Sequence, residues 1–375
     1  MPDSNRRGNP LLRFFGNQRW QFITIPLVAI LMSLITASII VLILGKNPLT
    51  TFQSLLQGSG FIPKPNYANF KNVFTDFVDT VDAVTPMIFA SLAVAVAFHA
   101  GLFNIGVSGQ MLLSGFVATI VVGYSPLPAV LAKPLVIIIG IIVGALVGGL
   151  IGFLKYRFNI NEVVAAIMLN YIIQYTISFF INTRYVDPVS RQSRVISSAS
   201  RLTLLNVPYG DIRMRIPIAF VIAILLAIFL WFFFAKMKPG FEMKMVGLNQ
   251  VASRYAGVRI GKTLIMAMMI SGALAGLAGV SYYLGFFSSI QPNVLTSVGF
   301  DAIAVSLLGN SHPIGVIFSS WLITALSRGG TYMSSMVGIR YEIAALIVGL
   351  ILLFSAMSQF IRQRINALIS RSDRR

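Results

Sequence analysis

Cysteine is absent from this chain of 375 residues, and histidine occurs only twice. The lack of cysteine excludes a disulfide framework, a thiolate nucleophile and any cysteine-based zinc or iron–sulfur site. His99 and His312 lie far apart in sequence and outside any HExxH-like pattern, so we predict no metal site. The sequence also shows no nucleophile–base pair, and it therefore indicates a protein that is not itself an enzyme.

Charged residues are scarce as well, at 11% of the chain against 56% hydrophobic residues, and the mean hydropathy is +0.82. One soluble core cannot bury so much apolar surface. The net charge of +18 would suggest DNA binding in a soluble protein, because Lys and Arg neutralise phosphates. Here the basic residues lie between apolar runs, so they fit orientation in a lipid membrane, and we predict no nucleic-acid partner.

Ten apolar runs are candidates for membrane-spanning helices. A hydrocarbon core about 30 Å thick takes roughly 20 residues of helix, and fewer where a helix is broken or re-entrant. The pattern predicts an all-α polytopic membrane protein with about ten transmembrane helices, some of them short or broken. The candidates are 22–44, 83–103, 109–124, 134–154, 162–181, 216–234, 263–285, 299–309, 313–329 and 341–361.

The basic residues predict the orientation. The tail 1–21 is basic and polar, and the apolar run after it is too long for a signal-peptide core, so we predict a retained first span. With ten crossings in the membrane domain 22–361, both termini are cytoplasmic, together with the basic loop 236–262 and the basic tail 362–375. The arginine-rich segment 182–215 is then extracellular, where long translocated loops weigh little in the positive-inside rule.

Two series of glycines recur at helical spacing. Small residues on one face let membrane helices approach closely and gain dispersion contacts. The spacing predicts close helix packing, with a gating role as the alternative. The glycines are Gly140, Gly144, Gly148 and Gly152 in one run and Gly272, Gly276 and Gly279 in another.

A polar stretch interrupts the apolar pattern at residues 99–110. It includes Asn104 and Gln110, and its free backbone groups need partners from protein or a water-filled cavity, as in the broken helices of transporters. The alternative is a tight cytoplasmic turn in which Asn and Ser cap a helix.

Two isolated polar side chains lie within other apolar runs. Asp301 is costly in a membrane unless it pairs, lines a wet cavity or acts in function, and the alternative is that it caps a half-helix at the outer surface. Asn170 bonds either a neighbouring helix or a solute. A cluster of four aromatic residues lies either in a belt at the membrane interface or at a site that stacks on a planar ring. Its members are Tyr282, Tyr283, Phe286 and Phe287.

The 236–262 loop contains a further informative stretch. Residues 247–249 predict a turn, with Asn249 as N-cap of a short helix through Ala256 that ends at Gly257. Such a helix fits a shallow groove on a soluble partner, and the alternative is a basic loop on anionic lipid. Gly257 and Gly261 resemble part of a phosphate-binding loop, but three residues separate them where that motif has four. We expect no nucleotide site in this chain.

Three stretches resemble the permease subunits of bacterial ABC importers, in the branched-chain amino acid and simple-sugar permease superfamily and most closely its nucleoside branch. They are GLFNIGVSGQM (101–111), GLNQVASRYAG (247–257) and GFDAIAVSLLGNSHPIG (299–315). The resemblance covers about residues 84–357. Ser108 and Ser253 depart from it, since Glu and Ala are common in the family at these places.

The resemblance implies a subunit that forms half of the pathway of an ATP-driven importer, most closely for nucleosides, in the bacterial cytoplasmic membrane. It implies a separate ABC ATP-binding subunit, a second permease that is homologous but different, so that the two form a heterodimer, and an extracellular substrate-binding lipoprotein as partners, besides membrane lipid. ATP and Mg would bind the partner, and this chain would hold no cofactor. The implied coupling residues are Gly247, Asn249, Ala252, Arg254, Tyr255, Ala256 and Gly257.

The candidate solute contacts follow from this reading. Amides and a carboxylate hydrogen-bond ribose and base edges, and an aromatic ring stacks on a base. Two alternatives stay open, a simple-sugar or branched-chain amino acid permease and, in another class, an ion-driven secondary transporter or channel. The candidates are Phe98, Asn104, Gln110, Asn170 and Asp301.

Overall fold

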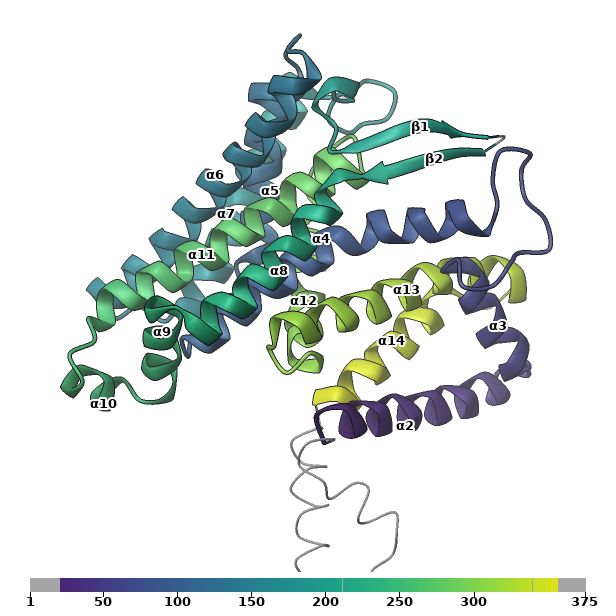
Figure 1. Ribbon diagram of the computed structural model, residues 1–375. Helices are drawn as coiled ribbons and strands as arrows, with labels where there is room; N and C mark the ends of the chain where they lie inside the picture. The colour runs from purple at the N-terminus through teal and green to yellow at the C-terminus, as the bar shows by residue number, and fades with distance from the viewer. Residues whose placement is uncertain (1–20, 211, 339, 357–375) are drawn as a thin grey trace, which may run out of the picture. The chain divides into compact units, whose positions relative to one another are not determined.

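The computed structural model describes residues 21–210, 212–338 and 340–356, which are mostly helical (Figure 1). Among these residues, five helices are long and apolar enough to cross a membrane. The chain is thus a multi-pass membrane protein, as predicted. The five are α4 (Val73–His99), α6 (Ala129–Phe158), α7 with its π-helical end η2 (Glu162–Tyr185), α8 (Ile218–Lys236) and α11 with η4 (Ile260–Phe286).

Shorter apolar helices accompany these five. Leu31–Ile43 and Pro48–Gly58 form a pair bent by 117°, which makes a sixth span if it is counted as one. Helix α3 (Pro48–Gly58) is absent from the predicted runs. Helices α5 (Val107–Ala118), continued by η1 (Thr119–Gly123), and α12 (Val298–Leu308) are too short for a full crossing. The count of about ten helices therefore stays a prediction.

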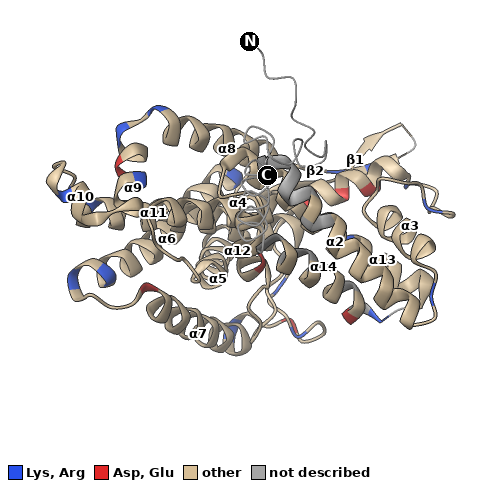
Figure 2. Ribbon diagram, turned by 90° about the horizontal axis from the view of Figure 1, so that it is seen from below, with Lys and Arg blue, Asp and Glu red and all other residues tan. Residues whose placement is uncertain are grey.

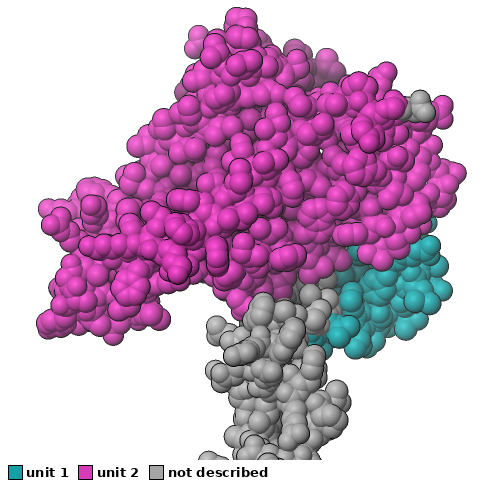
Figure 3. All heavy atoms as spheres, viewed as in Figure 1, with its two compact units in different colours: residues 1–55, 329–375 teal, residues 56–328 magenta. Residues whose placement is uncertain are grey.

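The chain divides into two compact units (Figure 3). One comprises residues 1–55 and 329–375, in which α2 (Gln21–Ile43) packs against α14 (Tyr341–Ala356). The other, residues 56–328, carries all the candidate functional residues. Helix α13 (Pro313–Val337) belongs to both. The predicted tails 1–21 and 362–375 lie outside the described residues, except Gln21.

Helix α4 is the centre of the larger unit. It begins ten residues before the predicted run because Asn72 and Thr75 form a capping box, in which each side-chain oxygen accepts the other residue's backbone N–H at 3.0 Å. Residues 84–97 are buried throughout. Helices α5, α11 and α12 pack around α4, as expected for a helix whose stretch 84–97 is apolar on nearly all sides.

Helices α6 and α11 meet through the two glycine series (Figure 1). A Cβ added at Gly144 would clash with the carbonyl oxygen of Gly272, and one at Gly276 with the carbonyl oxygen of Gly140. Gly279 lies equally close to the backbone of Met111 in α5. The predicted close packing is confirmed, since only glycine permits these backbone contacts.

The segment 182–215 departs from the all-α prediction. It carries a β-hairpin in which β1 (Thr203–Tyr209) pairs antiparallel with β2 (Ile212–Pro217). The signal was the alternation of apolar and basic residues from Ile212 to Ile216, which has the period of a strand. Five residues of alternation are easily missed beside spans of roughly 20 apolar residues.

Polar contacts fasten this segment to the helices. The Thr203 hydroxyl donates to a carboxylate oxygen of Asp82 in α4 at 2.8 Å, and the Arg215 guanidinium lies 3.8 Å from the Asp79 carboxylate. The backbone N–H of Leu202 donates to the carbonyl of Leu284 at 2.9 Å. The segment is therefore an ordered cap on one end of α4 and α11.

Candidate functional site

The predicted short helix exists as α10 (Gln250–Tyr255). The Asn249 side-chain oxygen accepts the backbone N–H of Ala252 at 3.0 Å, and Gly257 ends the turn with a φ of +82°. The N-cap and the terminating glycine are confirmed. The turn at 247–249 is wrong at its first two residues, because helix α9 (Lys238–Leu248) continues through Gly247 and Leu248.

Helix α10 presents an apolar and aromatic surface with one arginine. Tyr255 is 89% exposed and Val251 66% exposed, and Arg254 is exposed beside them. Ser253 faces inward, and its hydroxyl donates to the carbonyl of Asn249 at 2.8 Å. An exposed aromatic and an arginine on a rigid short helix are the groups that anchor protein interfaces.

Basic residues gather around α10 (Figure 2). They lie on α8, α9 and α10 and in the last turn of α6, which carries Lys155 and Arg157. The ring of Tyr156 packs directly on Gly261 at the start of α11, so the end of α6 lies at the same end of the unit as α10. The basic residues of 155–157 and 236–262, which the sequence grouped on one side of the membrane, thus lie together at one end of the unit.

Helix α9 connects α10 to the polar stretch after α4. Gly101 has a φ of +69°, and a Cβ built there would lie 3.0 Å from the Cα of Gly247. A Cβ on Gly247 would clash with the carbonyl oxygen of His99. The His99 ring also stacks on Phe234 of α8, with centroids 4.2 Å apart. Helix α9 and the turn that follows α4 are therefore in close backbone contact.

That turn leads into a buried polar cluster. The Asn104 amide donates to Ser271 of α11 at 2.8 Å and to the Gln110 side chain at 3.1 Å, and its oxygen accepts the backbone N–H of Gly106 at 3.0 Å. Ser271 donates onward to the carbonyl of Ala93 in α4 at 2.6 Å. These side chains are fully buried, so the cluster joins α4, α5 and α11.

A second set of bonds extends the cluster to α7 and α12. The Asn170 oxygen accepts the backbone N–H of Gly109 at 3.0 Å, and its amide donates to the carbonyl of Ile105 at 3.1 Å. The Ser108 hydroxyl donates to the carbonyl of Thr296, just before α12, at 2.9 Å. The helix interruption between α4 and α5 is confirmed, and protein groups satisfy its polar atoms.

The structure thus separates the five predicted solute contacts. Asn104, Gln110 and Asn170 come together in or beside the cluster, and their amides are bonded within the protein. Phe98 is half-buried against Phe103, with ring centroids 5.3 Å apart. Asp301 is half-buried in the first turn of α12 and pairs with Ser297. Contact of these residues with a solute stays a prediction.

Asn104→Ala is expected to destabilise the protein. The change leaves Gln110, Ser271 and the N–H of Gly106 without their shared partner, and each unpaired buried polar group costs about 1–3 kcal/mol. We expect roughly 2–4 kcal/mol less unfolding free energy, seen as a lower thermal midpoint in detergent. Gln174→Ala, which removes an exposed bond to Asn293, is the control. Unchanged stability with weakened solute uptake would instead indicate a direct contact with solute.

Comparison with known proteins shows the family of the chain. Residues 78–356 match the family of branched-chain amino acid transport systems, permease component. The chain is 35% identical over 347 residues to the guanosine ABC transporter permease protein NupP of Bacillus subtilis, covering 92% of this chain and 96% of NupP. The chain belongs to this permease family. As an ABC permease it is a transport subunit, which works with an ATP-binding subunit and a substrate-binding protein.

Two further relatives show the range of solutes named in the family. The present chain is 33% identical over 349 residues to the nucleoside ABC transporter permease protein NupB of Lactococcus lactis, with 91% of this chain and 92% of NupB covered. The glucose ABC transporter permease protein TsgB13 of Haloferax volcanii is 27% identical over 288 residues, with 74% and 75% covered. Family membership therefore does not by itself select the solute.

The contact of Gly247 with the turn at Gly101 was not predicted from the sequence. The feature of the sequence that could have indicated this contact is Gly247 itself, because it lies in a basic stretch whose other residues favour a helix. Glycine costs up to about 1 kcal/mol relative to alanine in a helix, so its presence there indicates a close backbone approach. The sequence alone does not name the backbone that approaches.

Proposed function

We propose that this permease imports nucleosides, as one half of the translocation pathway of an ATP-driven importer. The observation that carries the proposal is its similarity, over nine-tenths of its length, to permeases named for guanosine and nucleosides. Its helix α10, with exposed Tyr255 and Arg254, would bind the ATP-binding subunit. The permease itself would hold no cofactor, since ATP and Mg would bind that subunit.

The membrane arrangement belongs to the same proposal. About ten helices would cross or enter a bacterial cytoplasmic membrane, with both termini on the side of α10. The basic ends of α6 and α8 beside α9 and α10 support this orientation, because cytoplasmic loops carry an excess of Lys and Arg. A second, homologous permease would supply the other half of the pathway, and a lipoprotein would deliver the solute from outside.

Transport would proceed by alternating access. The ATP-binding subunit would move α10, and α9 would carry the motion to the turn at Gly101 through its contact with Gly247. The polar cluster would pass it on, because Asn104 and Asn170 join α5 to α11 and α7. Residues 287–297, between η4 and the short helix α12, form no helix, and non-helical chain beside short helices lines solute sites in transporters.

The test is uptake by a bacterial strain that lacks its own importer and expresses the whole complex. We expect labelled guanosine to accumulate, with competition by other nucleosides but not by glucose or leucine. Uptake is expected to disappear when the Walker lysine of the ATP-binding subunit is replaced. Accumulation of glucose alone would favour the sugar alternative, which the similarity to TsgB13 supports. Uptake by the lone permease in liposomes without ATP would favour an ion-driven transporter.

A further inference from the structure

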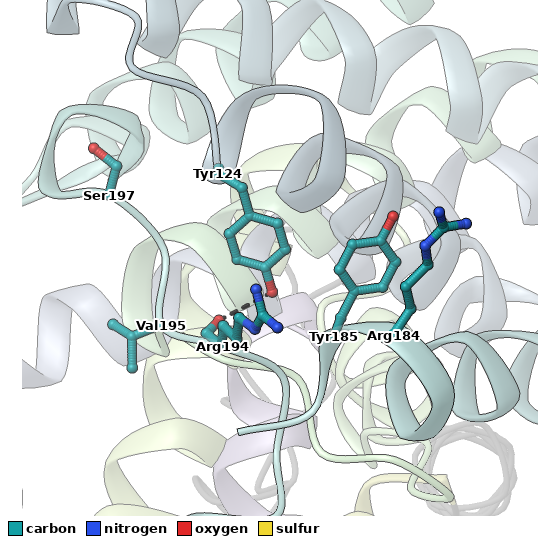
Figure 4. A pocket seen from close by; sticks show the side chains of 7 residues that line it. Tyr124, Arg184, Tyr185, Arg194, Val195 and Ser197 are labelled. Carbon is teal, nitrogen blue, oxygen red and sulfur yellow. Dashed lines mark hydrogen bonds between the residues drawn. The ribbon is translucent and has the colours of Figure 1, made fainter. Parts of the chain in front are cut away.

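An open pocket lies in the larger unit, beside the segment that precedes β1 (Figure 4). That segment is at the end of the unit that is remote from α10 (Figure 1). Its volume is about 540 Å³. The walls come from the ends of two π-helical turns, with Tyr124 following η1 and Arg184 and Tyr185 in η2, and from Arg194 in the connection that follows. None of these residues takes part in the coupling surface or the buried polar cluster.

The pocket is built from ordered contacts. The rings of Tyr124 and Tyr185 stack, with centroids 5.8 Å apart and planes at 21°. The Tyr124 hydroxyl donates to the carbonyl of Arg194 at 3.1 Å, and the Arg194 N–H donates to the carbonyl of Tyr185 at 2.9 Å. Phe116 supports Tyr185 edge-on at 6.2 Å. A wall held in this way binds a partner with little loss of conformational entropy.

The charge of the pocket is unbalanced. Arg184 and Arg194 are exposed, and their guanidinium groups lie on opposite sides of the Tyr185 ring (Figure 4). In the described part of the chain neither forms an ion pair, whereas Arg215 of the same segment pairs with Asp79. Asp187 interacts with Arg194 electrostatically, but its carboxylate is occupied by the N–H groups of Ser190 and Val189, which lower its pKa.

We propose that this pocket, formed by Tyr124, Arg184, Tyr185 and Arg194, receives an acidic side chain of the substrate-binding protein. The proposal rests on the proposed function, which places this end outside the cell. Guanidinium groups bind carboxylates through paired N–H donors, and the tyrosine rings supply a rigid apolar wall beside them. Charge complementarity favours this occupant, because two arginines that form no ion pair with any described residue are exposed at the end where that protein would arrive.

The test compares two double variants in the complete importer reconstituted in nanodiscs of neutral lipid. Arg184→Glu with Arg194→Glu reverses the pocket charge, and Arg191→Glu with Arg213→Glu makes the same change at exposed arginines of the same segment outside the pocket. We expect the pocket pair to weaken binding of the labelled substrate-binding protein about tenfold or more. The control pair is expected to weaken it less than about threefold. The basal rate of ATP hydrolysis without the binding protein is expected to equal that of the wild-type importer in both double variants.

Rescue identifies the partner group. An Asp or Glu on the binding protein, replaced by Arg, is expected to restore binding to the Arg184→Glu and Arg194→Glu pair. Equal losses in the two double variants, or no loss in the pocket pair, would overturn the proposal. So would an effect that appears only in nanodiscs with anionic lipid, since the pocket would then hold a headgroup. If the wild-type importer binds its partner through the pocket but takes up sugar, the docking site stands and the nucleoside proposal fails.

Discussion

Replacing Arg254 and Tyr255 by Asp together is expected to release the ATP-binding subunit from the permease and abolish uptake. Tyr255 is 89% exposed and Ser253 is the inward-facing residue of α10, so the change acts on the surface and not on the fold. Interface anchors of this kind contribute about 2 kcal/mol or more each. We expect binding of the ATP-binding subunit to fall at least about 30-fold, measured by pull-down of the tagged permease from membranes in mild detergent.

Tyr209→Asp is the matched control. Tyr209 is also a well-exposed tyrosine, at 67%, but it lies on β1 at the end of the unit remote from α10 (Figure 1). This variant is expected to retain the ATP-binding subunit. Retention of the ATP-binding subunit and of uptake by the Arg254 and Tyr255 variant would place the coupling surface elsewhere. A permease recovered alone but still active would favour the ion-driven alternative.

Gly276→Val is expected to prevent the permease from folding. The new side chain would meet the carbonyl oxygen of Gly140 across the α6–α11 contact, and neither backbone can retreat within a close-packed helix pair. Overpacking of this kind costs about 3 kcal/mol or more, a large part of the stability of a marginally stable protein. Gly144→Val acts on the same contact from the other helix. Size-exclusion profiles and thermal midpoints in detergent are the measurements.

Gly149→Val provides the control on α6. A Cβ built there lies near only the flexible side chain of Met269, whose Cγ is 2.8 Å away. We expect nearly normal yield and thermal midpoint. Normal folding of Gly276→Val would show that the two helices separate readily. If that variant folded but did not transport, the gating alternative for the glycine series would be favoured.

Local features of the site were predictable from the sequence because they depend on neighbours in the chain. Asn249 caps α10 through an N–H only three residues away. Gly257 ends the helix by its own left-handed φ. The interruption between α4 and α5 also follows from local composition, since glycines and polar residues cluster there. The hairpin was missed because five residues of alternation, Ile212 to Ile216, give a weak signal beside long apolar runs.

The sequence by itself determined that the chain is a multi-pass membrane protein, that its glycine series pack helices closely and that its short helix has a cap and an end. Hydropathy and small-residue spacing carry this information along single segments. Only the tertiary structure decided that Asn104 bonds Ser271, 167 positions away, and that Gly247 lies against the turn at Gly101. Such pairs depend on which helices become neighbours, and no local period or propensity encodes that choice.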